Sequence, residues 1–339
     1  MSIQLSDQYF KRGRDFLNVK YPIICGAMTW VSEPKLVAAV CNAGGFGCLA
    51  GGNAPVEILK KQIEETKLLT NKPFAVNIIT ITPAYYDHLN LVTEMKIPYI
   101  IFAGGLPKGN EITQAKESGA KVICFASAQT IAKRMIRYGA DALIIEGTEA
   151  GGHIGQVSLN VLIQQIMFET PEIPFFVAGG IGTPKFAAHM FMMGATGIQL
   201  GTRFAISEEC IAHDNFKKKF LRANARDAVA TPTFDSRLPV VPVRALKNKG
   251  HESFNKLQLE LIEKLDNNTI TKEEAQIKVE GFWMGALRNA VVDGDAETGS
   301  LMAGQSVGLF DDIKCVKNII DELVVGIEEE LLLIKKTLS

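Results

Sequence analysis

The chain has 339 residues, of which 47% are hydrophobic and 22% are charged, and its formal net charge is −1. This much apolar material is enough for one large core, and barrels of ~250 residues or more fold as one domain. The 36 basic and 37 acidic side chains leave no basic excess to neutralise a phosphate backbone. This balance argues against nucleic acid as a partner.

Residues 1–20 are polar and mixed in charge, and they contain no apolar segment of the kind that a signal peptide requires. Apolar runs elsewhere, such as Tyr99 to Ala103, are far shorter than the ~20 residues of a membrane helix. We therefore expect a cytoplasmic protein that does not enter membranes. The six cysteines occur singly, without a CxxC pair, so we expect no metal site.

Short apolar runs recur between residues 21 and 202, and each ends in small residues. Near-continuous apolar runs of this length are typical of parallel strands that are buried on both faces. The predicted strands are Tyr21–Gly26, Gly45–Gly51, Pro73–Ile79, Tyr99–Gly105, Lys121–Ser127, Asp141–Gly147, Pro174–Gly180 and Gly197–Thr202.

Amphipathic patterns typical of helices lie between these strands. Examples are Pro34–Ala43, Val56–Leu69 and Ala128–Tyr138. Three helices are predicted to end at Gly119, Gly139 and Gly194, because glycine accepts the left-handed conformation of a helix cap. A strand–helix unit repeated about eight times favours an α/β fold of the closed (β/α)8 TIM-barrel type. An open doubly wound sheet is the alternative, since periodicity alone does not show closure.

The repeating pattern stops after Arg203. Residues 205–300 carry charge-rich helical patterns at Asn215–Arg226, Ser253–Leu265 and Lys272–Arg288, which predict a helical insertion after strand eight. This insertion could be a lid on the substrate side, a packed appendage or the surface of a homodimer. Leu301–Leu309 is expected to return to the barrel mouth, and Asp311–Lys336 to form a closing helix. The predicted organisation is a barrel of residues 1–204 and 301–339 with an insertion of residues 205–300.

In barrels of this class the active site lies at the C-terminal ends of the strands. Strand one ends in Gly26-Ala27-Met28, whose small residues let a flat ring approach the backbone. Strand three ends in Asn77, an amide that offers both donors and acceptors, although a local loop cap is the alternative. Strands seven and eight end in Gly179-Gly180 and Gly201-Thr202. Glycine turns ahead of a helix expose backbone N–H groups that can hold a phosphate.

His153 follows strand six in the glycine-rich run Glu146–Gly155. A histidine at the barrel mouth is poorly placed for core packing, and its imidazole can donate a proton near neutral pH or hold a carbonyl. His153 is therefore the candidate catalytic residue. The other histidines are predicted on solvated faces (His88, His189, His251) or at a helix start (His213). No nucleophile elbow or Walker loop is present, so a hydrolase or kinase has no support.

The motifs resemble those of the nitronate monooxygenase / 2-nitropropane dioxygenase superfamily of FMN barrels, and most closely those of its enoyl-acyl-carrier-protein reductase II branch. The superfamily motifs are Gly26-Ala27-Met28, Asn42-Ala43-Gly44-Gly45, Pro73-Phe74 with Asn77, Gly151-Gly152-His153, Ala178-Gly179-Gly180-Ile181 and Gly201-Thr202-Arg203-Phe204. The branch motifs are Gly51-Gly52-Asn53-Ala54-Pro55, Glu149–Gly155, Val243-Arg244-Ala245, Ala290–Asp295 and Gly299–Gln305.

This resemblance implies an FMN-dependent oxidoreductase in which His153 falls on the catalytic histidine. The residues that it implies in cofactor binding are Ala27, Met28, Asn77, Glu146, Gly151, Gly152, Gly179, Gly180, Gln199, Gly201, Thr202, Met302, Gly304 and Gln305. The chain departs from the reductases at Ala103-Gly104-Gly105-Leu106-Pro107, where they carry a Gly-Ala-Gly-Asn-Pro type of sequence. This loop borders the substrate side, so the acyl substrate stays open.

Three functions are compatible with these residues. The first is reduction of trans-2-enoyl thioesters of acyl-carrier-protein or CoA in fatty-acid synthesis. NADH or NADPH would supply the electrons, and His153 would hold the thioester carbonyl or assist protonation at the α-carbon. Arg244 and Lys247 could meet a phosphate of the nucleotide or carrier, or could be ordinary solvated charges.

The second function is oxidation of alkyl nitronates by O2, with His153 as a base or an anion contact. The third is flavin binding without turnover, against which the intact His153 argues. The tail motifs from Asp293 to Gln305 favour the first function over the second.

Overall fold

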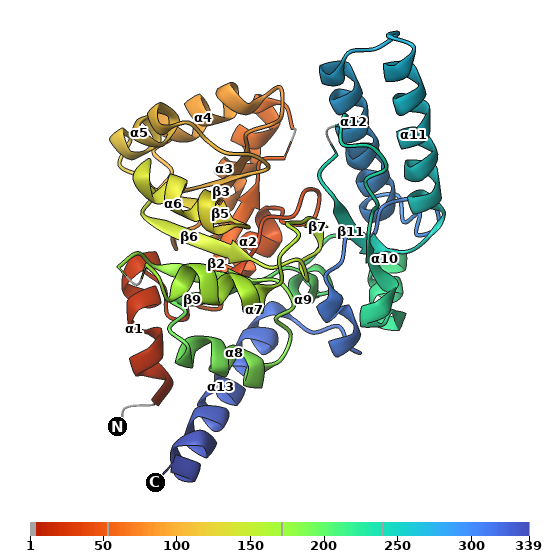
Figure 1. The fold of residues 1–339 in the computed structure, drawn as a ribbon. Coiled ribbons are helices and arrows are strands. Elements are labelled where there is room, and N and C mark those ends of the chain that lie inside the picture. The colour runs from red at the N-terminus through yellow and green to blue at the C-terminus, as the bar shows by residue number, and fades with distance from the viewer. Residues whose placement is uncertain (1–4, 53, 171, 239, 339) are drawn as a thin grey trace.

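The computed structural model describes residues 5–338 except 53, 171 and 239, and its centre is a closed barrel of parallel strands (Figure 1). Each strand pairs with the next along the chain, and the last pairs with the first. The barrel strands are β1 (Ile23–Cys25), β2 (Phe46–Ala50), β3 (Ala75–Ile79), β4 (Tyr99–Ala103), β5 (Lys121–Ala126), β6 (Ala142–Glu146), β8 (Phe175–Ala178) and β9 (Gly197–Leu200). This closure confirms the predicted (β/α)8 barrel.

Large side chains fill the inside of the barrel, because alternate positions of each strand point inward. Ile24, Phe46, Ile144 and Phe176 belong to this inner cluster and are buried. The opposite faces of the strands pack against the surrounding helices in a second and larger cluster. Most strand positions on both faces are therefore apolar, which is why the strands appear in the sequence as near-continuous apolar runs.

Helix α1 (Leu5–Leu17) packs against the inner cluster of the barrel. Leu17 is fully buried in that cluster, and the Tyr99 hydroxyl donates to the carbonyl of Phe16 at 2.8 Å. The sequence did not predict this helix. Residues 1–20 appear polar because only one narrow face of the helix is buried.

An outer layer of helices surrounds the barrel. These helices are α2 (Pro34–Asn42), α3 (Val56–Leu69), α4 (Tyr85–Glu94), α5 (Gly109–Glu117), α6 (Gln129–Arg137), α7 (Leu159–Leu162) with the π-helical turn η1 (Ile163–Met167), α8 (Pro184–Met192) and α13 (Val316–Leu338). Gly119, Gly139 and Gly194 have φ values of 94°, 96° and 106°, which confirms the three predicted caps.

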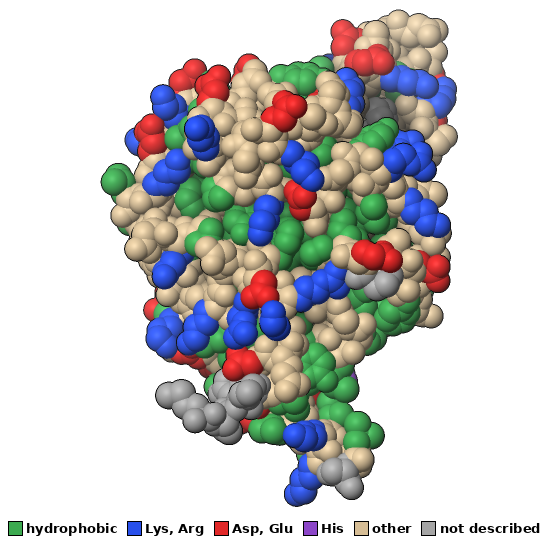
Figure 2. Space-filling view, turned by 90° about the vertical axis from the view of Figure 1, so that its left-hand side faces the viewer, with side chains coloured by type: hydrophobic (Ala, Val, Ile, Leu, Met, Phe, Trp, Pro, Cys, Tyr) green, Lys and Arg blue, Asp and Glu red, His purple; other side chains and the backbone are tan. Residues whose placement is uncertain are grey.

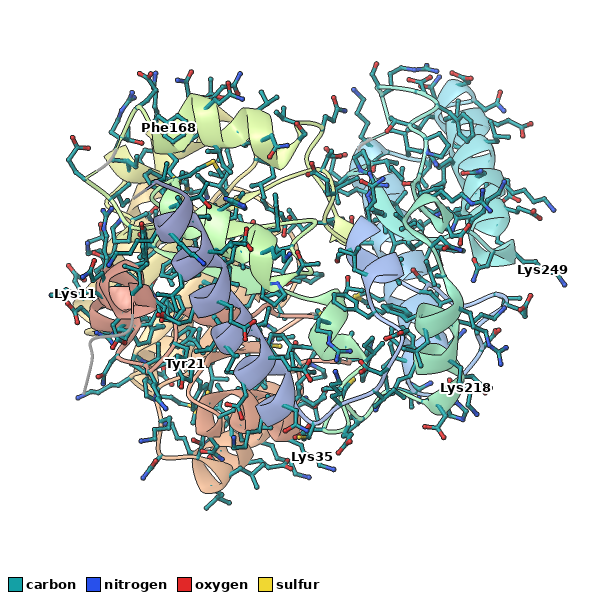
Figure 3. All side chains as sticks on the ribbon, turned by 90° about the horizontal axis from the view of Figure 1, so that it is seen from below. Lys11, Tyr21, Lys35, Phe168, Lys218 and Lys249 are labelled. Atoms are coloured by element: carbon teal, nitrogen blue, oxygen red, sulfur yellow. The ribbon has the colours of Figure 1, made fainter. Side chains whose placement is uncertain are left out.

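Helix α13 packs on α8 and α1, and it crosses the barrel in the view of Figure 3. It begins later than the predicted closing helix, because residues 311–315 are irregular. Charges of both signs are interspersed on the barrel face that Figure 2 shows. Among the described helices, none combines the length and the apolar composition that a bilayer crossing requires.

The segment between β9 and α13 forms a second group of elements beside the barrel (Figure 1). They are α9 (Thr202–Ala205), α10 (Asp214–Arg222), η2 (Ala225–Asp227), β10 (Ala228–Ala230), β11 (Val243–Leu246), α11 (Lys249–Asp266), α12 (Lys272–Val291) and η3 (Gln305–Leu309). The predicted helices are present, and β10 and β11 are two strands that no sequence pattern indicated. These strands form a three-stranded antiparallel sheet with β7 (Gly152–His153).

Two cores hold this segment in place. Phe254, Leu261 and Trp283 form a separate cluster between α11 and α12, which supports an insertion with its own packing. Phe216 and Phe220 of α10 belong instead to the large cluster around the barrel. The division at residues 205 and 300 remains a prediction, since the segment shares side chains with the barrel core.

Candidate active site

A pocket of about 730 Å³ opens where the ends of the barrel strands, the loop after β6 and helix α12 meet. Every residue predicted to bind the cofactor lines this pocket except Gln305, and His153 lines it too. Gln305 is not among the lining residues. Its backbone N–H donates to the Glu149 carbonyl at 2.9 Å, while its neighbours Gly304 and Ser306 line the pocket.

Close backbone approaches shape one wall of the pocket. A Cβ on Gly151 would lie 2.5 Å from the carbonyl carbon of Ala303, so only glycine fits there. Gly179 and Gly180 have φ values of 96° and 72°, which other residues rarely adopt. A wall of bare backbone of this kind fits the face of a flat ring, in agreement with the predicted flavin.

The turn Gly180–Gly182 offers backbone donors ahead of α8. The N–H groups of Gly180, Ile181 and Gly182 donate to no residue of the described chain. Thr183 caps the helix by accepting from the Phe186 N–H at 3.3 Å. Free donors at a helix start fit a phosphate group.

The Thr202 hydroxyl accepts a hydrogen bond from the Gly304 N–H at 3.0 Å. This bond holds the chain that returns from the insertion against the pocket.

Three polar side chains reach the pocket from strand ends. Asn77 donates from Nδ2 to the Ile101 carbonyl at 3.2 Å, so it bridges β3 and β4 and is not a local loop cap. Gln199 of β9 lies against Gly26, where a Cβ would be 3.0 Å from its Cδ. Burial raises the pKa of Glu146 to about 8, so this carboxyl is largely protonated at neutral pH and can donate a hydrogen bond.

His153 lies in a strand and not in the predicted loop. β7 pairs with β11 through His153 and Val243, and the Ile154 N–H donates to the Pro242 carbonyl at 2.9 Å. The side chain of His153 is 36% exposed, and its Nε2 lies 3.4 Å from Oε2 of Glu280. The segment after β9 therefore supplies both the strand that holds this histidine and a carboxylate beside its ring.

Sequence reasoning missed Glu280. The signal that could have found it is the spacing along α12, because Glu273, Ile277, Glu280 and Met284 recur every three or four residues and all line the pocket. The sequence of an amphipathic helix does not indicate which of its faces will line an active site and which will face solvent.

Two of the other histidines are not on solvated faces, so that interpretation was wrong for them. His88 is fully buried, with Nε2 2.8 Å from the Ala54 carbonyl, and His251 is buried in the insertion. His189 is half exposed, as predicted. His213 caps α10 as predicted, because its Nδ1 accepts from the Asn215 N–H at 3.1 Å.

Arg244, for which a phosphate contact and an ordinary solvated charge were both open, is buried and does not line the pocket. Its guanidinium donates from Nε to the Thr148 carbonyl at 3.0 Å and from Nη1 to the Ala228 carbonyl at 2.6 Å. The residue is only 8% exposed. Arg244 therefore fastens the loop after β6 to β10, and Lys247 does not line the pocket.

The charge of the pocket is acidic. Glu273 and Glu280 line it together with His153 and with Glu146, whose raised pKa keeps it largely uncharged, and no lysine or arginine is among its described lining residues. Lys218 and Lys249 lie on the side of the insertion that faces away from the barrel (Figure 3). In the part of the chain that the structure describes, no three His, Cys, Asp or Glu residues come together as a metal site.

The loop that departs from the reductases forms an apolar wall. Ala103 to Leu106 line the pocket beside Ile79 and Ile81, and Ile277 of α12 lines it from the insertion. Asn53 of the Gly51–Pro55 motif lies outside the described residues. The residues that differ from the reductases therefore form one apolar wall of the pocket, while the wall of backbone at Gly151, Gly179 and Gly180 keeps the glycines of the family motifs.

Comparison with known proteins assigns the class. The structure matches that of FabK from Thermotoga maritima with a TM-score of 0.85 and 37% identity, covering 96% of this chain and 98% of that one. A (3aS,4S,5R,7aS)-5-hydroxy-7a-methyl-1-oxo-octahydro-1H-indene-4-carboxyl-CoA dehydrogenase of Rhodococcus jostii is 30% identical, covering 91% of this chain and 93% of that protein. A probable nitronate monooxygenase of Staphylococcus saprophyticus is 29% identical, covering 79% of this chain and 88% of that protein.

The dehydrogenase and the monooxygenase are oxidoreductases by name, and the protein is an oxidoreductase as well. The model of the nitronate monooxygenase family matches residues 11–89 and 79–326, so the chain belongs to that family.

Proposed function

We propose that the protein is an FMN-dependent enoyl-acyl-carrier-protein reductase, which uses NADH or NADPH to reduce trans-2-enoyl thioesters in fatty-acid synthesis. Two relatives support this choice. The sequence of this chain is more similar to FabK, an enoyl-acyl-carrier-protein reductase II, than to the probable nitronate monooxygenase. The name of the Rhodococcus relative contains a CoA thioester as its substrate. Oxidation of alkyl nitronates by O2 is the alternative.

The observation that carries the proposal is the charge of the pocket. A nitronate is an anion, whereas the reacting part of an enoyl thioester is neutral. A nitronate would lie near the carboxylates of Glu273 and Glu280. Among the described lining residues, His153 is the one side chain that could offer it a positive charge. Like charges in a confined site disfavour binding. The pocket therefore suits the neutral substrate.

The apolar wall supports an acyl substrate as well. Ile79, Ile81 and Leu106 face the pocket on one side, and Ile277 and Met284 of α12 face it on the other. Each methylene of an acyl chain that is buried there contributes about 0.8 kcal/mol. This arrangement supports the insertion as a lid on the substrate side.

FMN would be held by the backbone N–H groups of Gly180–Gly182 at its phosphate and by the amides of Asn77 and Gln199. When bound, it supplies two-electron transfer between the nicotinamide and the enoyl double bond. The chain's own residues orient the reactants and handle the proton. His153 holds the thioester carbonyl or assists protonation at the α-carbon, and the protonated Glu146 donates a hydrogen bond.

An anaerobic experiment tests this function. NADH or NADPH is expected to bleach the bound flavin of the purified yellow protein, and crotonyl thioester is then expected to restore its colour. If neither nucleotide bleaches the flavin and an alkyl nitronate does, the protein is a nitronate monooxygenase.

The remaining parts of the proposal concern the acyl carrier, the oligomeric state and the location of the protein. Acyl-carrier-protein and CoA are both candidate carriers, and the homodimer and the cytoplasmic location remain predictions. Sedimentation of the FMN-loaded protein tests the dimer.

A further inference from the structure

One side chain of α12 reaches the candidate catalytic histidine. Oε2 of Glu280 lies 3.4 Å from Nε2 of His153, and the two side chains are 23% and 36% exposed. Nε2 itself is buried, and it makes no aligned hydrogen bond to the described residues. A buried ring nitrogen beside a carboxylate is the arrangement in which the nitrogen carries the proton.

Helix α12 carries Glu280 and is itself fixed at two points. The helix starts at a capping box, in which the Thr271 hydroxyl accepts from the Glu274 N–H at 3.1 Å. It is anchored by Trp283, whose ring packs 4.2 Å from that of Phe254. Glu280 lies one turn before Trp283 on the same face of α12, and both side chains line the pocket, which places the carboxylate beside His153.

The backbone of His153 is held by the same segment, through the pairing of β7 with β11. Backbone pairing leaves the rotation and the tautomer of the imidazole undetermined. A carboxylate that accepts from one ring nitrogen determines both, and such partners typically change activity 10- to 100-fold when they are removed from metal-bound histidines.

We propose that Glu280 is a positioning residue for His153, which accepts the Nε2–H and so turns Nδ1 toward the reactants in the pocket. Nδ1 can then gain and release a proton while the ring stays in place. Hydrogen bonds of this kind are often long until reactants bind, which agrees with the 3.4 Å separation. The kinetic part of this proposal rests on the proposed function, while the ring geometry does not.

The ring geometry is tested by NMR on the FMN-loaded protein labelled with 15N-histidine. The chain has five histidines, and the His153 signals are identified by their loss in His153→Ala. The Nε2–H tautomer of His153 is expected in the wild type and is expected to give way to a mixture of tautomers in Glu280→Ala.

The matched control is a second histidine–glutamate contact of the chain. Nε2 of His189 lies 3.4 Å from Oε1 of Glu330, and neither residue lines the pocket. Glu330→Ala is expected to leave the His153 signals and turnover unchanged. An unchanged His153 tautomer in Glu280→Ala would overturn the proposal.

Kinetics test whether the contact acts through His153. Glu280→Ala is expected to lower kcat for enoyl thioester reduction about 10-fold with KM within about 2-fold. Glu280→Gln keeps an acceptor oxygen and is expected to restore most of this loss. In a His153→Ala background, Glu280→Ala is expected to have no further effect on kcat.

Equal kcat losses in Glu280→Ala and Glu280→Gln would overturn the hydrogen-bond role, and so would the same loss in the His153→Ala background. Failure of the proposed function is a separate result. It would appear as a wild-type protein that reduces no enoyl thioester, and the NMR comparison would still decide whether Glu280 orients the ring.

Discussion

At the scale of single residues, His153 is set apart from the other histidines by what surrounds it. It lines the pocket, whereas His88 and His251 are buried elsewhere and His213 caps a helix. We expect His153→Ala to lower turnover about 10²-fold, the usual scale for a positioned proton donor. Flavin content and the unfolding midpoint are expected to change little, because the His153 side chain is partly exposed and its contact with Glu280, at 3.4 Å, is long. Steady-state kinetics check this, with His189→Ala as the control.

Glu146 makes the stability of the flavin-free protein depend on pH. Burial raises the pKa of this carboxyl from its ordinary value of 4.5 to about 8, so the folded chain holds a proton that the unfolded chain releases. Stability therefore falls as the pH rises through this window, by on the order of 3 to 4 kcal/mol between about pH 5 and about pH 8. Glu146→Gln is expected to lack this part of the slope. Urea unfolding of both proteins across the window measures it, and parallel slopes would contradict the assignment.

At the scale of elements, the loop after β6 is fastened to the insertion by Arg244. Removing its guanidinium leaves the carbonyls of Thr148 and Ala228 without their donor. Arg244→Ala is expected to lower the free energy of unfolding by about 2 kcal/mol and to speed hydrogen exchange in residues 147–155. Lys247→Ala is the matched control. A raised KM for the nucleotide with unchanged stability would instead restore the phosphate role.

The barrel elements were predictable because their signals are local. Each strand is an apolar run that ends in small residues, and each cap glycine carries its own conformational preference. The residues at which the predicted strands end were less accurate. The last strand was predicted as Gly197–Thr202 but ends at Leu200, because Thr202 already begins α9. The short strands β7, β10 and β11 had no such signal, since each has two to four residues and gains its hydrogen bonds from distant parts of the chain.

At the scale of the whole molecule, the acidic pocket favours NADH over NADPH. The 2′-phosphate of NADPH adds a charge of about −2. Among the described lining residues no lysine or arginine could pair with it, while Glu273 and Glu280 would repel it. We expect kcat/KM for NADH to exceed that for NADPH by at least about 10-fold. Stopped-flow bleaching of the flavin by each nucleotide measures the ratio, and equal rates would show that a cation outside the pocket wall reaches the phosphate.

The sequence by itself determined the strand–helix repeat, the position of the glycine turns and the choice of His153 as the candidate, because periodicity, cap glycines and motifs are properties of neighbouring residues. Closure of the sheet into a barrel came from the structure. Only the tertiary structure decided that Gln305 does not line the pocket, that Arg244 binds backbone carbonyls and that Glu280 lies beside His153. The physical reason is that these contacts join segments far apart in the chain. Their distances depend on how the insertion packs on the barrel, and no local pattern carries that information.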